Sequence, residues 1–150
     1  MAVKILARLT RSVCATLVCA FLPVVVVGAA PGPSPATSAV VEDLMRRDLT
    51  SDPHREALLL TVEYQPGGAS LPHRHDAQVF VYVLQGEMTM QVDGSPRVTL
   101  RAGETFYEGT DDIHRISANA SRTAPAKILV FIIKDKGKPD SRAVDEGRTP

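Results

Sequence analysis

Short apolar and alternating stretches, separated by turn residues, dominate the chain after residue 56. Residues 57–64 (ALLLTVEY), 79–84 (VFVYVL) and 127–134 (KILVFIIK) are rich in aliphatic, β-branched and aromatic side chains and predict strands. The density of apolar residues in 79–84 predicts a strand buried on both faces. Residues 88–92 alternate apolar with polar positions, and the Asp93-Gly94 pair after them is typical of a hairpin turn.

Weaker patterns complete the prediction of an all-β domain. Residues 97–101, 105–107 and 113–117 fit further short strands between turns that contain glycine or aspartate. Residues 40–48 fit either a short helix or an edge strand, and we expect a turn at 50–54 around a proline. Strands that recur about every eight to twelve residues, without a long helix, are typical of a β-sandwich or barrel.

The first 30 residues have the pattern of a secretory signal. Lys4, Arg8 and Arg11 precede an apolar run over residues 13–30 that ends in small residues. We expect cleavage after Ala29, which would make the protein secreted or periplasmic, with no membrane attachment afterwards. The competing interpretation is an uncleaved anchor, but the apolar run is shorter than the ~20 residues that a membrane span prefers.

Both cysteines, Cys14 and Cys19, lie inside this segment. Lipoprotein cleavage before Cys19 is a weaker alternative, because residues 16–18 match a lipobox poorly. After signal cleavage no thiol would remain, which excludes disulfides and thiolate metal ligands from the mature protein. The chain from Pro31 onward is slightly acidic and carries no basic stripe, which argues against nucleic-acid binding.

These patterns divide the chain into four parts. Residues 1–29 are the expected signal peptide, and residues 30–39 form a flexible linker rich in proline, serine and alanine. Residues 40–134 form a single β-domain. Residues 135–150 are polar, with glycine and proline, and we expect them to fray as a C-terminal tail.

Three histidines predict a metal site. His73 and His75 stand two residues apart at the mouth of a strand, and side chains two apart in an extended chain share a face. His114 lies in another predicted strand, whereas His54 precedes the strands in a loop and is expected to be exposed. A single strand histidine is usually an ordinary polar residue. Three together suit a divalent transition metal, namely Fe, Mn, Ni, Cu or Zn.

The spacing of these residues resembles the two sequence motifs of the cupin superfamily, in its small single-domain, type-2 form. The first motif is matched by Gly67, His73, His75, Val79 and Gly86. The second is matched by Gly103, Gly109, Asp111 and His114, with Asn119 one place late. The resemblance covers about residues 57–134. It implies a jelly-roll β-barrel of antiparallel strands in which the three histidines bind one metal ion.

The chain departs from this family where the acidic metal ligand is expected. That position is Val79, or Phe80 with a longer spacing, and neither side chain can bind a metal. Gln78 is a candidate fourth ligand if a bulge over residues 76–77 turns it inward, although strand parity would point it away from His75. Without a carboxylate, the site would be a neutral three-histidine cage with open positions for water or substrate.

Other polar residues have weaker functional interpretations. Glu104 and Glu108 could act as general acids or bases, but turn and surface roles are favoured for both. Asp111 or Asp112 could hydrogen-bond to a ligand histidine, although both are more typical of turns.

The signal pattern predicts an exported protein, and the resemblance implies that it binds a metal and a small-molecule ligand or substrate. As an enzyme it would carry out metal-assisted oxidation or isomerisation of a small organic substrate. The alternatives are a non-catalytic cupin that binds a small molecule or metal, which the missing carboxylate favours, and a metal-free structural barrel. A homodimer is also expected, through the strand-like edges at residues 40–48 and 127–134.

Overall fold

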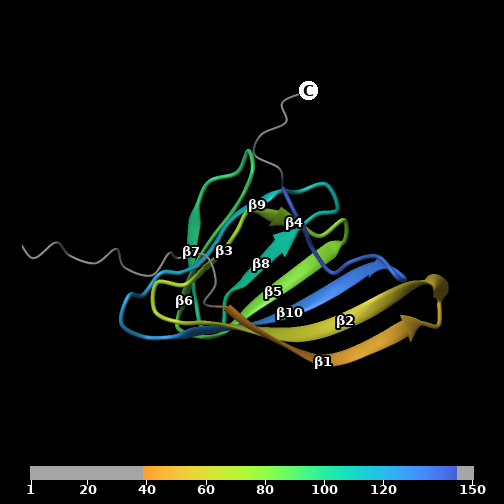
Figure 1. Ribbon diagram of the computed structural model, residues 1–150, viewed down its shortest axis with the longest axis horizontal. Helices are drawn as coiled ribbons and strands as arrows, with labels where there is room; N and C mark the ends of the chain where they lie inside the picture. Colours follow the sequence, from red (N-terminus) through yellow and green to blue (C-terminus); the bar gives the residue numbers. More distant parts are fainter. Residues whose placement is uncertain (1–38, 145–150) are drawn as a thin grey trace, which may run out of the picture. The chain divides into compact units, whose positions relative to one another are not determined.

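The computed structural model describes residues 39–144, and the regular elements in this range are all β-strands (Figure 1). They are β1 (Ala39–Leu49), β2 (Asp52–Tyr64), β3 (Ala69–Ser70), β4 (His73–Arg74), β5 (Gln78–Gln85), β6 (Glu87–Val92), β7 (Val98–Arg101), β8 (Thr105–Glu108), β9 (His114–Asn119), β10 (Ala126–Asp135) and β11 (Arg142–Ala143). The expected signal peptide, the linker up to residue 38 and the last six residues lie outside the described range. Within that range, no helix is long and apolar enough to cross a membrane.

One sheet contains five antiparallel strands in the order β1-β2-β10-β5-β8 (Figure 1). Residues 40–48 are therefore an edge strand and not a helix. The long strand β10 pairs with β2 on one side and with β5 on the other. The expectation that residues 127–134 offer a free sheet edge is wrong, because both edges of β10 are already hydrogen-bonded.

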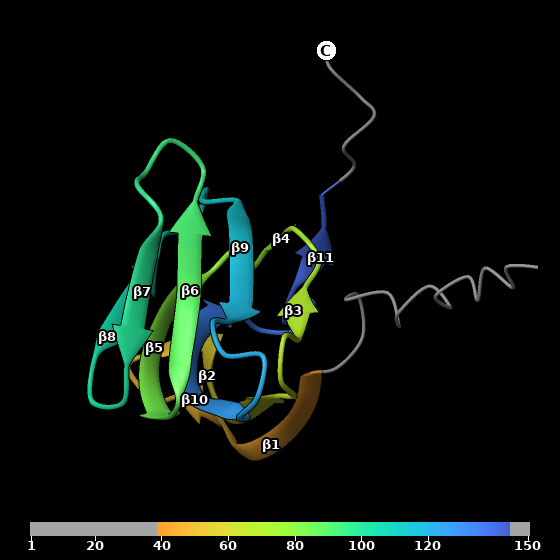
Figure 2. The same ribbon diagram turned by 90° about the vertical axis from the view of Figure 1, so that its left-hand side faces the viewer.

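The second sheet has the order β11-β4-β9-β6-β7, with β3 also paired to β9. Figure 2 shows β7, β6 and β9 side by side in this sheet, in front of β5 and β2 of the other one. The turn at Asp93-Gly94 joins β6 to β7, as its sequence predicts, and Gly94 has a positive φ of 76°. Two antiparallel sheets wound in this way form the expected jelly-roll barrel.

The core lies between the two sheets, where alternate side chains of each strand point inward. Its members are Leu58, Leu60, Val62, Tyr64, Ala77, Val79, Val81, Val83, Met88, Met90, Ala126, Ile128, Val130 and Ile132. Burial of β5 on both faces was expected and is wrong, because Phe80, Tyr82 and Leu84 are 42–44% exposed on the outer face. The sheet is antiparallel, and no described element covers this part of its outer face.

The segment after β10 differs from the expected frayed tail as far as it is described. β11 pairs with β4, so that Arg142 lies opposite Arg74 and Ala143 opposite His73. The Asp140 side chain binds Arg46 of β1, with Nη2 2.8 Å from Oδ2, and lies 3.3 Å from Lys134 Nζ. These contacts hold residues 136–144 against the barrel, beside the histidines.

Candidate metal centre

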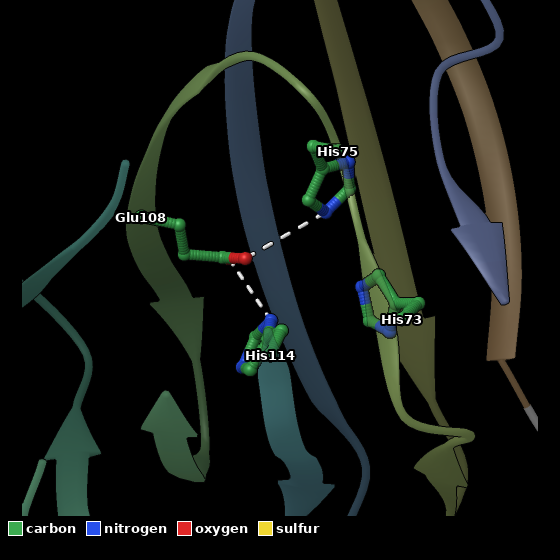
Figure 3. Close-up of side chains that lie close together, drawn as sticks. All are labelled: His73, His75, Glu108 and His114. Atoms are coloured by element: carbon green, nitrogen blue, oxygen red, sulfur yellow. Dashed lines mark ion pairs between the residues drawn. The ribbon is translucent and has the colours of Figure 1, made fainter. Parts of the chain in front are cut away.

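Four side chains converge at one end of the barrel interior (Figure 3). His73 is in β4, His75 follows it in the loop to β5, Glu108 ends β8 and His114 begins β9. Each side chain offers a donor atom, and these atoms all lie within 4.8 Å of one another. The pairing of β4 with β9 puts His73 directly opposite His114, with ring centroids 5.1 Å apart. The three predicted histidines are thus brought together.

Glu108 is the residue of this cluster that sequence reasoning placed wrongly. The side chains of β8 alternate, so that Thr105 and Tyr107 are exposed whereas Glu108 is only 3% exposed. Its Oε1 lies 3.0 Å from His114 Nδ1, and its Oε2 lies 3.7 Å from His75 Nε2. The favoured turn or surface role is therefore incorrect. The available signal was the inward parity of an acidic residue two places after Phe106.

Main-chain carbonyl groups set the orientation of two of the imidazoles. His73 Nδ1 donates to the Leu71 carbonyl oxygen at 2.7 Å, and His75 Nδ1 donates to that of Asp140 at 2.6 Å. Both contacts require the proton on Nδ1, so that in the neutral imidazole Nε2 carries the lone pair that can bind a metal. Residues 136–144 thus supply the contact that orients His75.

The arrangement of lone pairs favours a cation at this point. His75 Nε2 lies 3.7 Å from Glu108 Oε2, and in the neutral imidazole these two acceptors would repel each other unless a positive charge lay between them. Glu108 Oε2 and His114 Nε2 are buried without a hydrogen-bond partner among the described residues. Buried polar atoms are normally paired, so that these orphaned atoms fit a bound metal ion.

The protonation states are also those of a metal site. Burial alone would raise the pKa of Glu108, but the hydrogen bond from His114 and the neighbouring histidines outweigh it and lower the pKa. Burial lowers the pKa of His73, which keeps its imidazole neutral at neutral pH. The cluster therefore offers an ionised carboxylate and neutral imidazole. This mixed nitrogen and oxygen set suits a divalent transition metal.

The other sequence candidates lie outside the cluster. Gln78 begins β5 at the same parity as exposed Phe80, and it is not among the residues that line the adjoining cavity. Val79 is fully buried in the core. Asp112 accepts a hydrogen bond from the Gly109 amide at 2.7 Å, which is the turn role expected for it, and His54 is exposed at the start of β2.

A cavity of about 470 Å³ adjoins the cluster. Aliphatic side chains of β2, β5 and β10 form one wall, and His73, His75, Glu108 and His114 belong to the lining. The volume falls within the range of small-molecule sites. A ligand in this cavity would therefore lie beside the candidate metal centre.

The fold and the site together define a small jelly-roll barrel with an internal cluster of three histidines and a glutamate. Residues 60–132 match the family described as the cupin domain, and the chain belongs to the cupin superfamily. A search among curated proteins finds no matching sequence.

Solved structures with the same fold include enzymes. An oxalate oxidase in complex with the substrate analogue glycolate is 24% identical, with a TM-score of 0.57, over 79% of this chain and 61% of that one. The DMSP lyase DddQ from Ruegeria pomeroyi is 19% identical, with a TM-score of 0.52, over 61% of this chain and 45% of that one. An uncharacterised double-stranded β-helix protein from Klebsiella pneumoniae is 14% identical, with a TM-score of 0.56, over 73% and 86%.

The TM-scores of 0.52–0.57 establish a shared fold, and no more than the fold, at these identities. The chain spans about three fifths of the length of the oxalate oxidases that it matches.

Proposed function

We propose that this chain is an exported cupin that binds one divalent transition metal through His73, His75, Glu108 and His114 and acts on a small organic molecule. The observation that carries the proposal is the convergence of four donor groups within 4.8 Å at the wall of a cavity. Four protein donors leave positions open around an ion that prefers six ligands, and the cavity gives a small molecule access to them.

The donor set limits the choice of metal and of chemistry. Three imidazoles and one carboxylate suit Fe, Mn, Ni, Cu and Zn. When bound, such an ion polarises a ligand oxygen as a Lewis acid or, if redox-active, supports oxidation. The histidines and Glu108 would hold the ion, and the aliphatic walls offer an apolar surface to a substrate.

The non-catalytic alternative loses its main argument in this structure. It was favoured because the position of the acidic ligand is occupied by Val79. Glu108 supplies the carboxylate instead, and the open cavity gives a substrate room to bind. The solved structures of an oxalate oxidase and a DMSP lyase with the same fold support chemistry on a small organic molecule as the leading proposal.

Elemental analysis tests the metal site directly. The wild-type protein, purified without a histidine tag, is compared with a His73→Ala/His114→Ala variant and with His54→Ala as the matched control. We expect near-stoichiometric metal in the wild type and in His54→Ala, and little in the double variant. Absence of metal from the wild type after reconstitution with Fe, Mn, Ni, Cu and Zn in turn would overturn the proposal.

Export and self-association remain parts of the proposal. Export rests on the signal pattern of residues 1–29, and the N-terminal sequence of the mature protein tests it. A homodimer is supported by β1, an outer strand whose Val40, Val41 and Leu44 are 49–63% exposed. Light scattering at micromolar concentration tests it, and a clean monomer mass would exclude the dimer.

A further inference from the structure

A group of three hydroxyls lies in the cavity beside the metal cluster. Tyr64 Oη is 2.8 Å from Ser70 Oγ and 2.9 Å from Ser117 Oγ. Tyr64 is 2% exposed and Ser117 is 4% exposed, and all three residues line the cavity. They come from β2, β3 and β9, so that the fold and not a local turn brings them together. We call Tyr64, Ser70 and Ser117 the hydroxyl cluster of the cavity.

Hydrogen-bond accounting leaves this group incomplete. Three hydroxyls carry three protons, and the two contacts between them use two. Within residues 39–144 the third proton has no acceptor outside these three residues, so that it is available to a ligand in the cavity. Burial raises the pKa of Tyr64, so that the phenol stays neutral and remains a donor. The group can therefore donate to an uncharged ligand oxygen and accept from a ligand hydroxyl.

The remainder of the lining carries no positive charge. Among the described residues that line the cavity there is no lysine or arginine, and its aliphatic part includes Leu60, Val62 and Ile128. Asp43 and Asp140 also line the cavity, and both are paired with Arg46, at 3.5 Å and 2.8 Å. Arg46 and Lys134 also contact Glu56, so that neither offers a free positive charge to a ligand.

This charge distribution restricts the ligand. A carboxylate bound at the metal would be compensated there. A second carboxylate further along the cavity would be buried without a cation, and burial of an unpaired charge is strongly unfavourable.

We infer that the cavity binds a small, mainly aliphatic molecule with one metal-binding end and an uncharged hydroxyl or carbonyl oxygen that hydrogen-bonds with Tyr64, Ser70 and Ser117. The metal-binding end of this inference rests on the proposed function. The hydroxyl cluster and the apolar wall are observed independently of any metal. The class excludes molecules that carry a second carboxylate away from the metal.

Three probes that differ only at the far end test the inference. The full chain is loaded with Co²⁺, whose visible absorption reports ligands at the metal, and titrated with 6-hydroxyhexanoate, hexanoate and hexanedioate, and with their four- and five-carbon analogues. We expect the hydroxy acid of the best-fitting length to bind about fivefold to tenfold more tightly than its plain acid, as one hydrogen bond allows. The dicarboxylate should bind at least tenfold more weakly than the hydroxy acid.

Variants test whether the hydroxyl cluster causes the preference for the hydroxy acid. Tyr64→Phe and Ser117→Ala should bring the ratio of the affinities for the hydroxy acid and the plain acid close to one, while the affinity for the plain acid is kept. Tyr82→Phe, which removes the same atom from an exposed tyrosine on the outer face, should leave the ratio unchanged. Ser70→Ala, at a half-buried position, serves if thermal unfolding shows that the more buried variants are not folded.

A metal-free titration separates this inference from the proposed function. Hexan-1-ol needs no metal, and its saturable binding to the metal-free protein, followed by NMR, should weaken about fivefold or more in Tyr64→Phe and Ser70→Ala. Failure of the wild type to take up Co²⁺ would overturn the proposed metal site only. Equal affinity for the hydroxy acid and the dicarboxylate, or hexan-1-ol binding unchanged in both variants, would overturn the inference.

Discussion

Val79 and Glu108 lie directly opposite each other in the antiparallel pairing of β5 with β8, and both side chains point into the barrel. Directly opposed residues share a face, with Cβ atoms about 4.5–5.5 Å apart. The longer side chain of Glu108 can therefore bring a carboxylate to the place that an acidic residue at position 79 would supply. The carboxylate missing from one strand is provided by its neighbour.

The Glu108 assignment predicts a selective loss of metal affinity. Glu108→Gln keeps the shape of the side chain but removes the negative charge, and we expect metal affinity to fall by at least about 100-fold, the upper end of the effect of supporting residues. Metal titration with a competing chelator measures it. Glu104→Gln, at an exposed position four residues earlier, is the matched control. Equal metal affinity in the two variants would contradict the assignment.

The contact between Asp140 and His75 predicts that the C-terminal segment supports the metal site. Asp140→Ala removes the side chain that binds Arg46 and Lys134, so that the Asp140 carbonyl is no longer held against His75 Nδ1. We expect metal affinity to fall about tenfold, as for other groups that orient a ligand histidine. Asp93→Ala, which breaks an exposed ion pair with Arg115, should leave metal affinity unchanged. An unaltered metal affinity in Asp140→Ala would show that His75 is oriented without this segment.

A buried ion pair between Glu56 and Lys134 predicts acid sensitivity of the metal-free protein. The hydrogen bond from Lys134, at 2.5 Å, lowers the pKa of Glu56 below its ordinary value. A lowered folded-state pKa stabilises the protein above the ordinary carboxyl value, and this contribution is lost as the pH falls through the folded-state pKa. Chemical unfolding of the wild type should therefore show the free energy of unfolding falling through this range, and Glu56→Gln should flatten the dependence.

The same pair predicts a non-additive double variant. Glu56→Gln removes the closest partner of the 1% exposed Lys134 and leaves only Asp140, at 3.3 Å, as a carboxylate beside it, so that the change should cost about 2 kcal/mol at neutral pH. Adding Lys134→Met removes this poorly compensated charge and should recover most of the free energy. Glu63→Gln, from a loose surface pair with Lys127 at 4.0 Å, should cost less than about 1 kcal/mol. A double variant less stable than Glu56→Gln would contradict the account.

The turn between β5 and β6 requires glycine. Gly86 has a φ of 77°, and a Cβ there would lie 2.7 Å from the Pro125 carbonyl oxygen. Gly86→Ala should cost about 3 kcal/mol or more, because an unfavourable φ and a backbone clash act together. Gly94 has a similar φ of 76° but open space around it, so that Gly94→Ala should cost only about 1 kcal/mol. Thermal unfolding compares the two variants, and equal losses would show that the clash is relieved.

The sequence was informative wherever a local pattern has one structural solution. The period-2 alternation of residues 88–92 and the Asp93-Gly94 pair predict a hairpin, and the structure contains it. The spacing of His73, His75 and His114 predicts that they meet, because residues two apart share a face and the family motifs place the third histidine. The apolar stretch 79–84 led to the wrong prediction that both faces of the strand are buried, because composition does not say which face of a strand is covered.

The sequence by itself determined an all-β domain, because strand alternation is a local property of the chain, and its resemblance to the cupin motifs implied a jelly roll with three histidines on its inner surface. Only the tertiary structure decided that Glu108 completes the cluster, since its place depends on the pairing of β8 with β5. The position of residues 136–144 depends likewise on Arg46 and Lys134, which are distant in sequence from the histidines. The hydroxyl cluster of Tyr64, Ser70 and Ser117 also forms only when three separate strands meet, which no spacing along the chain could reveal.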